Sequence, residues 1–180
     1  NQFTEGFISA LEKTKIGNGL NKDTEMGPMA NERRIPVIEE MISDAKAKGA
    51  TVASGGSRIG NKGYFFQPTV LTDVPTDATM MNEEPFGPVA IVNRFSTYED
   101  AITEANRLPF GLASYAFTSS GETAQRLGQE VETGMLTINH MGLALPEVPF
   151  GGIKDSGYGT EGGSEAIQAY LETRFVSTLA

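Results

Sequence analysis

Two short segments combine the residue types that could hold a ligand. Residues 82–88 read Asn-Glu-Glu-Pro-Phe-Gly-Pro, and residues 149–152 read Pro-Phe-Gly-Gly. Each segment places an aromatic ring in a turn that proline and glycine make rigid, and the first adds two carboxylates. A rigid backbone, a planar ring and a carboxylate suit a site for a flat, hydroxylated ligand.

Each of these residues also has a plain structural interpretation. Glu83 and Glu84 could form a charged turn before a strand, and adjacent residues of an extended chain point to opposite faces, so they do not readily share a proton. Phe86 and Phe150 could be core rings, although both lie in loops at the ends of strand-like segments, where α/β proteins gather their ligands. His140 follows a predicted strand without a nucleophile in view, which favours a structural role.

Composition narrows the possible functions of the 180-residue chain. A formal charge of −9 argues against non-specific binding of nucleic acid. Without cysteine there is no disulfide, thiolate metal site or thiol nucleophile, and with one histidine we expect no metal site. No apolar run approaches the ~20 residues that span a bilayer, and no signal peptide is visible, so we expect no membrane association and a cytoplasmic location. The chain does not begin with Met and reads like the middle of a longer protein.

The first half of the chain predicts two helices and two strands. Apolar residues 3, 7, 8 and 11 form a helical stripe. Asn31 should cap a second helix, in which Pro36 causes a kink or a shifted start, and Gly49 ends it. The predicted buried face of that helix consists of Ile35, Ile38, Met41, Ile42 and Ala45. Residues 51–53 and 64–71 are strand candidates, and Pro68 favours an edge or hairpin position for the second.

The second half alternates regularly between strands and helices. Strands are expected at 89–95, 112–118 and 135–139, and helices at 97–107 and 120–131, with Thr97 and Ser120 as N-caps. This spacing predicts βαβ crossovers on a parallel, Rossmann-like sheet, and the continuously apolar strands predict burial on both faces. A short helix at 164–170 and a final strand at 171–179 follow. Residues 157–162 match G-x-G-x-x-G, but a loop precedes them, and the acidic residue expected about 20 positions later would fall among Phe175, Val176 and Ser177, so we interpret them as a loop.

The motifs, in this order, closely resemble the NAD(P)-dependent aldehyde dehydrogenase superfamily, and the resemblance covers nearly the whole chain. The matching blocks are Met26-Gly27-Pro28, residues 63–71 (Gly-Tyr-Phe-Phe-Gln-Pro-Thr-Val-Leu), residues 83–88 (Glu-Glu-Pro-Phe-Gly-Pro), residues 110–113 (Phe-Gly-Leu-Ala), Ile138-Asn139 and residues 149–157 (Pro-Phe-Gly-Gly-Ile-Lys-Asp-Ser-Gly). Within that family the pattern, including Tyr170-Leu171-Glu172, looks like the succinate-semialdehyde branch.

The resemblance implies a chemistry and a role for particular residues. In the family a Cys thiolate attacks an aldehyde, hydride passes to NAD or NADP, and a Glu activates the water that releases the acid. Both catalytic residues lie before the segment that begins here, so this chain should be inactive alone. Glu84 matches the residue that binds the nicotinamide ribose, and Phe86 matches the one that packs near the nicotinamide ring. Phe150 matches a residue of the substrate tunnel.

The loop at the predicted tunnel mouth is apolar, with Met141, Leu143, Ala144 and Leu145. Semialdehyde enzymes of the family generally place a polar residue there to meet a carboxylate. An apolar wall costs a charged group its hydration. This loop therefore points to a medium-chain or aromatic aldehyde as the small-molecule substrate.

The resemblance also divides the chain into 1–155, part of the catalytic domain, and 156–180, a Gly-rich crossing, a short helix and an oligomerisation strand. Because that strand pairs with a partner subunit in the family, we expect a homo-oligomer. Two alternatives stay open. The chain could be a non-catalytic α/β module for assembly or regulation, or the parent enzyme could release its product to coenzyme A.

Overall fold

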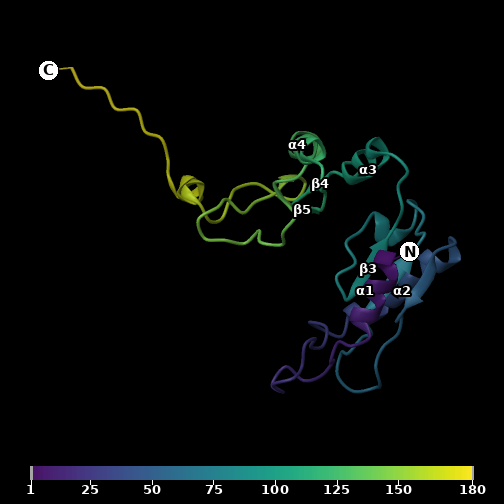
Figure 1. The fold of residues 1–180 in the computed structure, drawn as a ribbon. Helices are drawn as coiled ribbons and strands as arrows, with labels where there is room; N and C mark the ends of the chain where they lie inside the picture. Colours follow the sequence, from purple (N-terminus) through teal and green to yellow (C-terminus); the bar gives the residue numbers. More distant parts are fainter. Residues whose placement is uncertain (1, 180) are drawn as a thin grey trace. The chain divides into compact units, whose positions relative to one another are not determined.

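The computed structural model describes residues 2–179, and the chain forms two compact units, Asn1–Arg94 and Phe95–Ala180 (Figure 1). The first unit contains α1 (Gln2–Leu11), α2 (Arg34–Ala47), β1 (Thr51–Ser54), β2 (Thr69–Thr72), the 3-10 helix η1 (Thr79–Met81) and β3 (Val89–Val92). The second contains α3 (Tyr98–Ala105), β4 (Phe110–Gly111), β5 (Ala113–Ala116), α4 (Gly121–Glu130), β6 (Met135–Ile138), β7 (Ile153–Lys154) and the 3-10 helix η2 (Ser164–Tyr170). This combination confirms the predicted α/β class. The predicted division at residue 155 stays a prediction.

A three-stranded sheet in the order β1-β2-β3 organises the first unit. Strand β1 pairs antiparallel with β2, which pairs in parallel with β3, so that Thr69 lies opposite Val89. Side chains of α2 and of the sheet region form one hydrophobic cluster, which includes Ile38, Met41, Ile42, Ala45, Phe66 and Leu71. Ile38 and Leu71 are fully buried. Burying a large aliphatic side chain contributes roughly 1.5–3 kcal/mol, so this cluster is the main stabilising feature of the unit.

The predicted buried face of α2 is confirmed, and so is the shifted start that Pro36 predicted, but Asn31 is not the N-cap. Helix α2 begins at Arg34, and Arg33 occupies the N-cap position without a side-chain cap. The side-chain oxygen of Asn31 accepts no hydrogen bond from any described residue. Proline is tolerated only in the first turn, where its missing N–H is not needed. The start therefore shifts until Pro36 is the third helical residue.

Strand β2 is shorter and more central than the sequence suggests. The predicted strand 64–71 becomes a four-residue strand, Thr69–Thr72, which begins just after Pro68. Of the two predicted positions, the edge is wrong, because β2 is the middle strand of its sheet, whereas its antiparallel pairing with the preceding strand β1 fits the hairpin position. The proline explains the late start because it cannot donate to the ladder.

The second unit contains the expected parallel crossover. Strands β5 and β6 pair in parallel, with α4 between them in sequence, and β4 pairs antiparallel with β7. Thr97 caps α3 in a reciprocal capping box with Asp100. The Ser120 hydroxyl accepts the Thr123 N–H at the start of α4. Both predicted N-caps are confirmed, because capping depends only on neighbouring residues.

The expected strands pair in parallel, but two of them are less buried than expected. Strand β3 pairs in parallel with β2, and β5 pairs in parallel with β6, in agreement with the predicted parallel-sheet class. The predicted burial on both faces is not observed for β3 and β5. Residues of β5 alternate between exposed and half-buried, and those of β3 are all half-buried. Continuously apolar strands tend to be buried on both faces, but the burial of each strand also depends on which elements pack against it.

Two asparagine side chains, one after β3 and one after α3, form paired hydrogen bonds with the backbone of another segment. The Asn93 amide donates to the Val74 carbonyl at 2.8 Å and accepts the Val74 N–H at 2.9 Å. The Asn106 amide donates to the Glu130 carbonyl at 2.7 Å and accepts the Glu132 N–H at 2.8 Å. Each amide satisfies a backbone donor and a backbone acceptor just beyond an element, where the regular ladder has ended.

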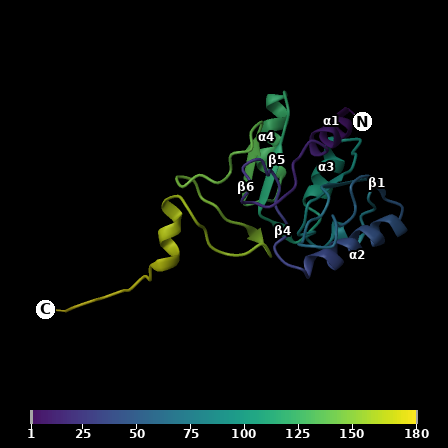
Figure 2. The same ribbon diagram turned by 90° about the horizontal axis from the view of Figure 1, so that it is seen from below.

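The C-terminal segment forms no strand within the chain. Residues 171–179 are extended and exposed, after η2, which confirms the short helix expected at 164–170 (Figure 2). Phe175 is 89% exposed and Leu179 is 99% exposed. The predicted strand is therefore not observed in the single chain, because a strand requires a hydrogen-bonded neighbour. Its pairing with a partner subunit stays a prediction.

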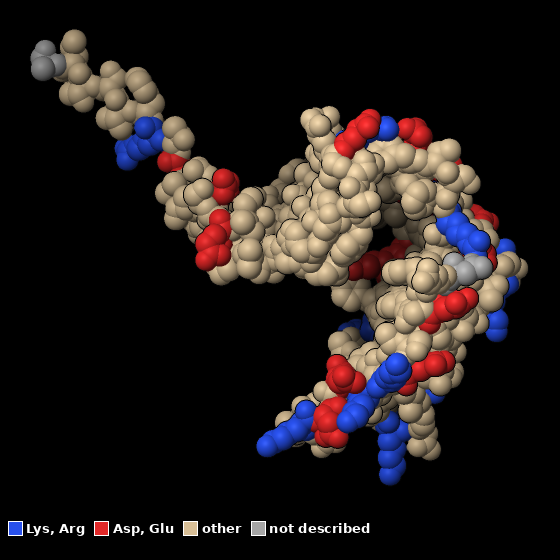
Figure 3. Space-filling view, viewed as in Figure 1, with Lys and Arg blue, Asp and Glu red and all other residues tan. Residues whose placement is uncertain are grey.

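Charged side chains of both signs are interspersed on the face shown in Figure 3. Among residues 2–179, no helix is long and apolar enough to cross a membrane. The same residues contain no group of three or more His, Asp or Glu side chains placed to hold a metal ion.

An ion-pair cluster joins the two helices of the second unit. Arg126 on α4 donates to Glu130 at 2.9 Å and to Glu99 on α3 at 3.2 Å. Its guanidinium carbon lies 4.0 Å from the centre of the Tyr98 ring.

The hydrogen bonds from Arg126 lower the pKa of Glu130 from its ordinary value of 4.5. In the first unit, hydrogen bonds from Lys48 and the Thr79 N–H lower the pKa of Asp44 from 3.8.

These lowered pKa values predict acid sensitivity. A carboxyl group with a lower pKa in the folded state stabilises the fold fully above its unfolded pKa and loses that contribution as pH falls through the folded value. The urea midpoint should therefore be level from pH 6 to 8 and decline below the ordinary values of 4.5 and 3.8. Glu130→Gln should lower the midpoint at pH 7 and reduce the decline. Glu122→Gln, at an exposed position of the same helix, is the control, and an equal effect of both substitutions would contradict the interpretation.

Candidate functional site

The first predicted segment folds into two consecutive tight turns, each centred on a proline. The Phe86 N–H donates to the Glu84 carbonyl at 2.9 Å around Pro85, and the Val89 N–H donates to the Gly87 carbonyl at 2.8 Å around Pro88. Proline fixes φ near −65°, which suits a three-residue turn. We call residues 84–88 the Glu-Phe turn. It leads directly into β3.

Contacts with the core hold the Glu-Phe turn in place. The Thr69 N–H of β2 donates to the Pro88 carbonyl at 2.8 Å. Gly87 lies against the fully buried Ile38 of α2, so closely that a Cβ at this position would come within 2.9 Å of Ile38 Cγ1 and 3.0 Å of Cδ1. Only glycine permits this approach of the backbone to the helix.

The turn presents both of its predicted site residues to solvent. The Phe86 ring is 64% exposed, so its interpretation as a core ring is wrong. Glu84 is exposed, and among the described residues its carboxylate has no hydrogen-bond or ion-pair partner. Exposing a large ring and an unpaired carboxylate side by side does not stabilise the unit, and this favours a binding role for both.

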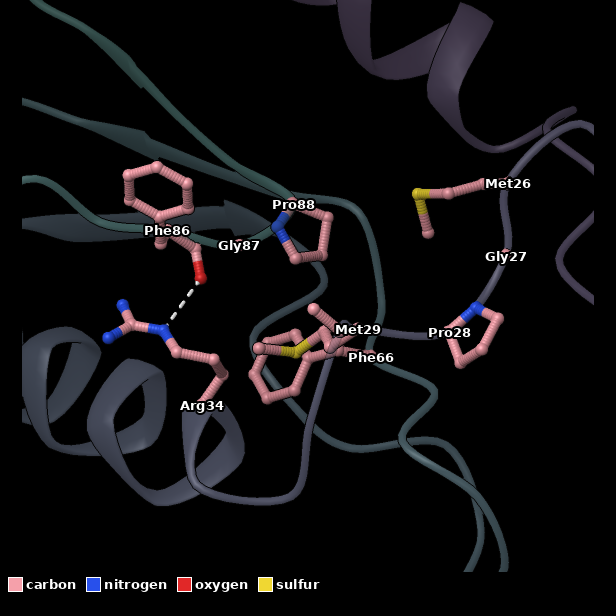
Figure 4. A pocket seen from close by; sticks show the side chains of 10 residues that line it. Met26, Gly27, Pro28, Met29, Arg34, Phe66, Phe86, Gly87 and Pro88 are labelled. Atoms are coloured by element: carbon pink, nitrogen blue, oxygen red, sulfur yellow. Dashed lines mark hydrogen bonds between the residues drawn. The ribbon is translucent and has the colours of Figure 1, made fainter.

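A cavity of about 250 Å³ lies beside the turn (Figure 4). Its lining is mainly apolar and consists of Met26, Gly27, Pro28, Met29, Ala30, Arg34, Phe66, Phe86, Gly87 and Pro88. Two segments far apart in sequence, 26–28 and 86–88, therefore meet at one cavity. The sequence motifs marked both segments but did not indicate that they meet.

Arg34 is the site residue that the sequence did not reveal. Its Nε donates to the Phe86 carbonyl at 3.1 Å, across a sequence separation of 52 residues. In Figure 4 the guanidinium group reaches from α2 to that carbonyl, and the Phe86 ring lies on the opposite side of its own backbone. The Nη2 atom of Arg34 is buried and has no hydrogen-bond partner among the described residues. No local pattern marks such a long-range contact.

The second predicted segment lies in the other unit, in a loop that follows β6. Asn139, with a positive φ of 63°, begins this loop. Its amide donates to the Thr118 carbonyl and accepts the Thr118 N–H, each at 2.9 Å. The Thr137 hydroxyl donates to the His140 carbonyl at 2.7 Å. His140 Nδ1 accepts the Gly142 N–H at 3.2 Å, which supports its structural interpretation.

The far end of the loop is closed by a backbone bridge. The Phe150 N–H donates to the Glu161 carbonyl at 2.6 Å, and the Glu161 N–H donates to the Phe150 carbonyl at 2.8 Å. Gly162, with φ of 66°, follows, and a Cβ there would come within 2.6 Å of the Val148 carbonyl oxygen. Residues 157–162, the G-x-G-x-x-G match, thus close a loop, and no strand directly precedes them.

Within this loop the four predicted pocket residues differ in exposure. Leu143 is buried, Phe150 is half-buried, and Ala144 and Leu145 are exposed. The exposed pair can line a pocket directly, whereas Leu143 supports the loop from within. The structure thus brings Glu84 and Phe86 together in the first unit, and these four residues together in one loop of the second.

The arrangement is suited to binding and orientation. The first unit offers an exposed carboxylate, an exposed ring and a guanidinium group that borders an apolar cavity. These groups can accept hydrogen bonds from hydroxyls, contact a planar ring and donate to an acceptor. The chain has no cysteine, so it contains no thiol nucleophile.

Comparison with known proteins places these features in context. A family profile described as "Aldehyde dehydrogenase family" matches residues 1–176. The chain is 43% identical over 178 residues to 4-(hydroxymethyl)benzenesulfonate dehydrogenase TsaD1 of Comamonas testosteroni, covering 99% of this chain and 37% of that protein. It is 40% identical over 175 residues to the mitochondrial succinate-semialdehyde dehydrogenase of Rattus norvegicus, covering 97% and 34%.

A solved structure agrees with the sequence matches. Betaine aldehyde dehydrogenase of Staphylococcus aureus, crystallised in complex with NAD+, is similar to this chain with a TM-score of 0.90 and 38% identity, covering 96% of this chain and 36% of that one. The chain thus spans 34–37% of the length of these three proteins.

The contact between Gly87 and Ile38 gives a direct test of how the turn is held. Gly87→Ala should destabilise the protein by about 1–3 kcal/mol, because the added methyl group overpacks a closed contact. Gly27→Ala is the matched control, since Gly27 lines the same cavity but has no atom within 4 Å of an added Cβ. Urea unfolding measures both. Equal stability of the two variants would show that the turn is not fixed by this contact.

Proposed function

The chain belongs to the aldehyde dehydrogenase family, as its motifs predicted, and we propose that it forms part of an enzyme that oxidises an aldehyde to a carboxylate with NAD or NADP. The observation that carries this proposal is the Glu-Phe turn, which exposes both Glu84 and Phe86 and places Phe86 at the edge of a cavity. These are the two residues that the family resemblance assigns to the nicotinamide end of the cofactor.

The groups on the first unit fit a nicotinamide dinucleotide. The Glu84 carboxylate can accept hydrogen bonds from the two hydroxyls of a ribose, which are short and strong when the acceptor is charged. The exposed Phe86 ring offers a planar apolar surface for the nicotinamide region. When bound, the cofactor supplies the hydride acceptor, and these residues orient it.

The proposed reaction also needs a thiol and a general base, which the family resemblance places outside these 180 residues. With no cysteine, the isolated chain should not turn over an aldehyde. Its contribution is to bind the cofactor and to shape the approach of the substrate. We also propose that the enzyme is a homo-oligomer joined through residues 171–179, because this segment is extended, exposed and rich in apolar side chains.

For the substrate, we propose an apolar or aromatic aldehyde. The loop that matches the family's tunnel mouth exposes Met141, Ala144 and Leu145, and Leu145 is 53% exposed. None of these side chains can compensate for the desolvation of a carboxylate on the substrate, such as the one that succinate semialdehyde carries. One relative is named for a substituted benzene, the other for succinate semialdehyde. The apolar loop favours the aromatic class.

Glu84 and its neighbour provide a matched test of the cofactor role. In the complete protein that contains this chain, Glu84→Gln should weaken NAD or NADP binding roughly tenfold, because it removes charge-assisted hydrogen bonds. Glu83→Gln, at the adjacent exposed position, should bind normally. Calorimetric titration measures both variants. Unchanged affinity of the Glu84 variant would remove this residue from the cofactor site.

The substrate proposal is tested with an aldehyde panel. The complete protein should have a higher kcat/KM for benzaldehyde and octanal than for succinate semialdehyde. Leu145→Arg should raise kcat/KM for succinate semialdehyde and lower it for benzaldehyde, because the exposed position lets a guanidinium group stay hydrated while it meets the carboxylate. Leu145→Gln keeps a polar side chain without the charge and is the control. A preference of the unmodified protein for the semialdehyde would contradict the proposal.

A further inference from the structure

We propose that Arg34 is a positioning residue for the Glu-Phe turn. By holding the Phe86 carbonyl, it fixes the backbone from which Glu84 and Phe86 project. The inference rests on the proposed function only for its consequence for cofactor binding. The contact itself, from Arg34 Nε to the Phe86 oxygen at 3.1 Å, is independent of that function.

The hydrogen bonds within the Glu-Phe turn do not fix its position, so the turn needs contacts with other segments of the unit. Its internal bonds, Phe86 N–H to Glu84 and Val89 N–H to Gly87, span only two residues each. Upstream, the Glu83 N–H donates to the Thr79 carbonyl, and downstream the Pro88 carbonyl accepts from Thr69, each at 2.8 Å. Among the described hydrogen bonds, the one from Arg34 is the only one that ties the stretch between these two anchors to another segment.

Packing of the Phe86 side chain cannot take over this task. Its ring is 64% exposed, so few contacts restrain it. The backbone must therefore be held directly if the ring and the Glu84 carboxylate are to keep one orientation. Pre-organising a binding group in this way lowers the entropy cost of binding.

Arg34 is itself well placed to act as a fixed donor. It lies in the first turn of α2, immediately before the buried Ile35 and one turn before the fully buried Ile38. Its Nη2 atom is buried, and the residue as a whole is half-buried, so its side chain is partly restrained by the surrounding protein. The planar, delocalised guanidinium keeps its donors in a rigid geometry.

The neighbouring arginine is a matched control. Arg33 is exposed and occupies the N-cap position of the same helix without a side-chain cap bond. Arg33→Ala and Arg34→Ala therefore remove the same charge and the same number of atoms, one residue apart. Only the second removes the bond to Phe86.

Limited proteolysis with chymotrypsin tests the contact directly. Chymotrypsin cleaves after phenylalanine by attacking its carbonyl group. At Phe86 this carbonyl is the one that accepts the hydrogen bond from Arg34. In the complete protein, Arg34→Ala should raise cleavage between Phe86 and Gly87 roughly tenfold, as expected for loss of a hydrogen bond to a charged donor. Arg33→Ala should leave it unchanged. Arg34→Lys should restore part of the protection, since an ammonium donates without the rigid fork.

Cleavage after Phe117, an exposed ring of the second unit, is the internal reference for general loosening. A parallel rise at Phe86 and Phe117, or an equal rise in both alanine variants, would overturn the proposal. Intact-mass analysis identifies the cut.

The KM for the cofactor then distinguishes the positioning role of Arg34 from the proposed role of the turn in cofactor binding. If both hold, Arg34→Ala raises the KM for NAD or NADP, with a smaller change in kcat, and Arg34→Lys recovers part of the loss. Faster cleavage at Phe86 with unchanged cofactor KM upholds the positioning role and counts against the turn as a cofactor site. Unchanged cleavage overturns the positioning role, whatever the kinetics.

Discussion

The packing of α2 against the sheet is the constraint on which the first unit and its candidate site both depend. Ile38 is a fully buried member of the hydrophobic cluster and is also the side chain against which Gly87 lies. One turn earlier on the same helix, Arg34 reaches the Phe86 carbonyl. Stability and site geometry therefore have a common origin, because the helix that buries the core also determines where the Glu-Phe turn lies. A shift of α2 along the sheet would move both.

Features that depend on nearby residues could be predicted from the sequence. The buried stripe of α2 and the caps Thr97 and Ser120 follow from spacings of three or four residues, and the structure confirms them. Strand limits and burial were less predictable, because they depend on partners distant in sequence. Pro68 suggested an edge or hairpin position, and β2 begins just after it, pairs antiparallel with β1 and is the middle strand of its sheet. The extended 171–179 segment shows the same dependence, since strand pairing needs a neighbour.

The candidate site could be predicted in part for the same reason. Rigid Pro/Gly turns mark Glu84, Phe86 and Phe150 in the sequence, and both turn residues of the first unit are exposed as a binding role requires. Arg34 could not be recognised, because its partner lies 52 residues away. Leu143 shows the converse limit. Composition identified an apolar loop but could not distinguish the side chain that faces inward from those that face solvent.

Three asparagines, at 93, 106 and 139, share one way of fastening the chain, in which a single amide both donates to and accepts from main-chain groups. This makes the fold vulnerable to a slow covalent change. Hydrolysis of such an amide to aspartate keeps the size and the accepting oxygen but replaces the NH2 by a second oxygen, which is ionised at neutral pH. At each of the three sites that oxygen would face a carbonyl oxygen and repel it. Deamidation during storage should therefore loosen this protein at the ends of its strands and helices before it affects the core.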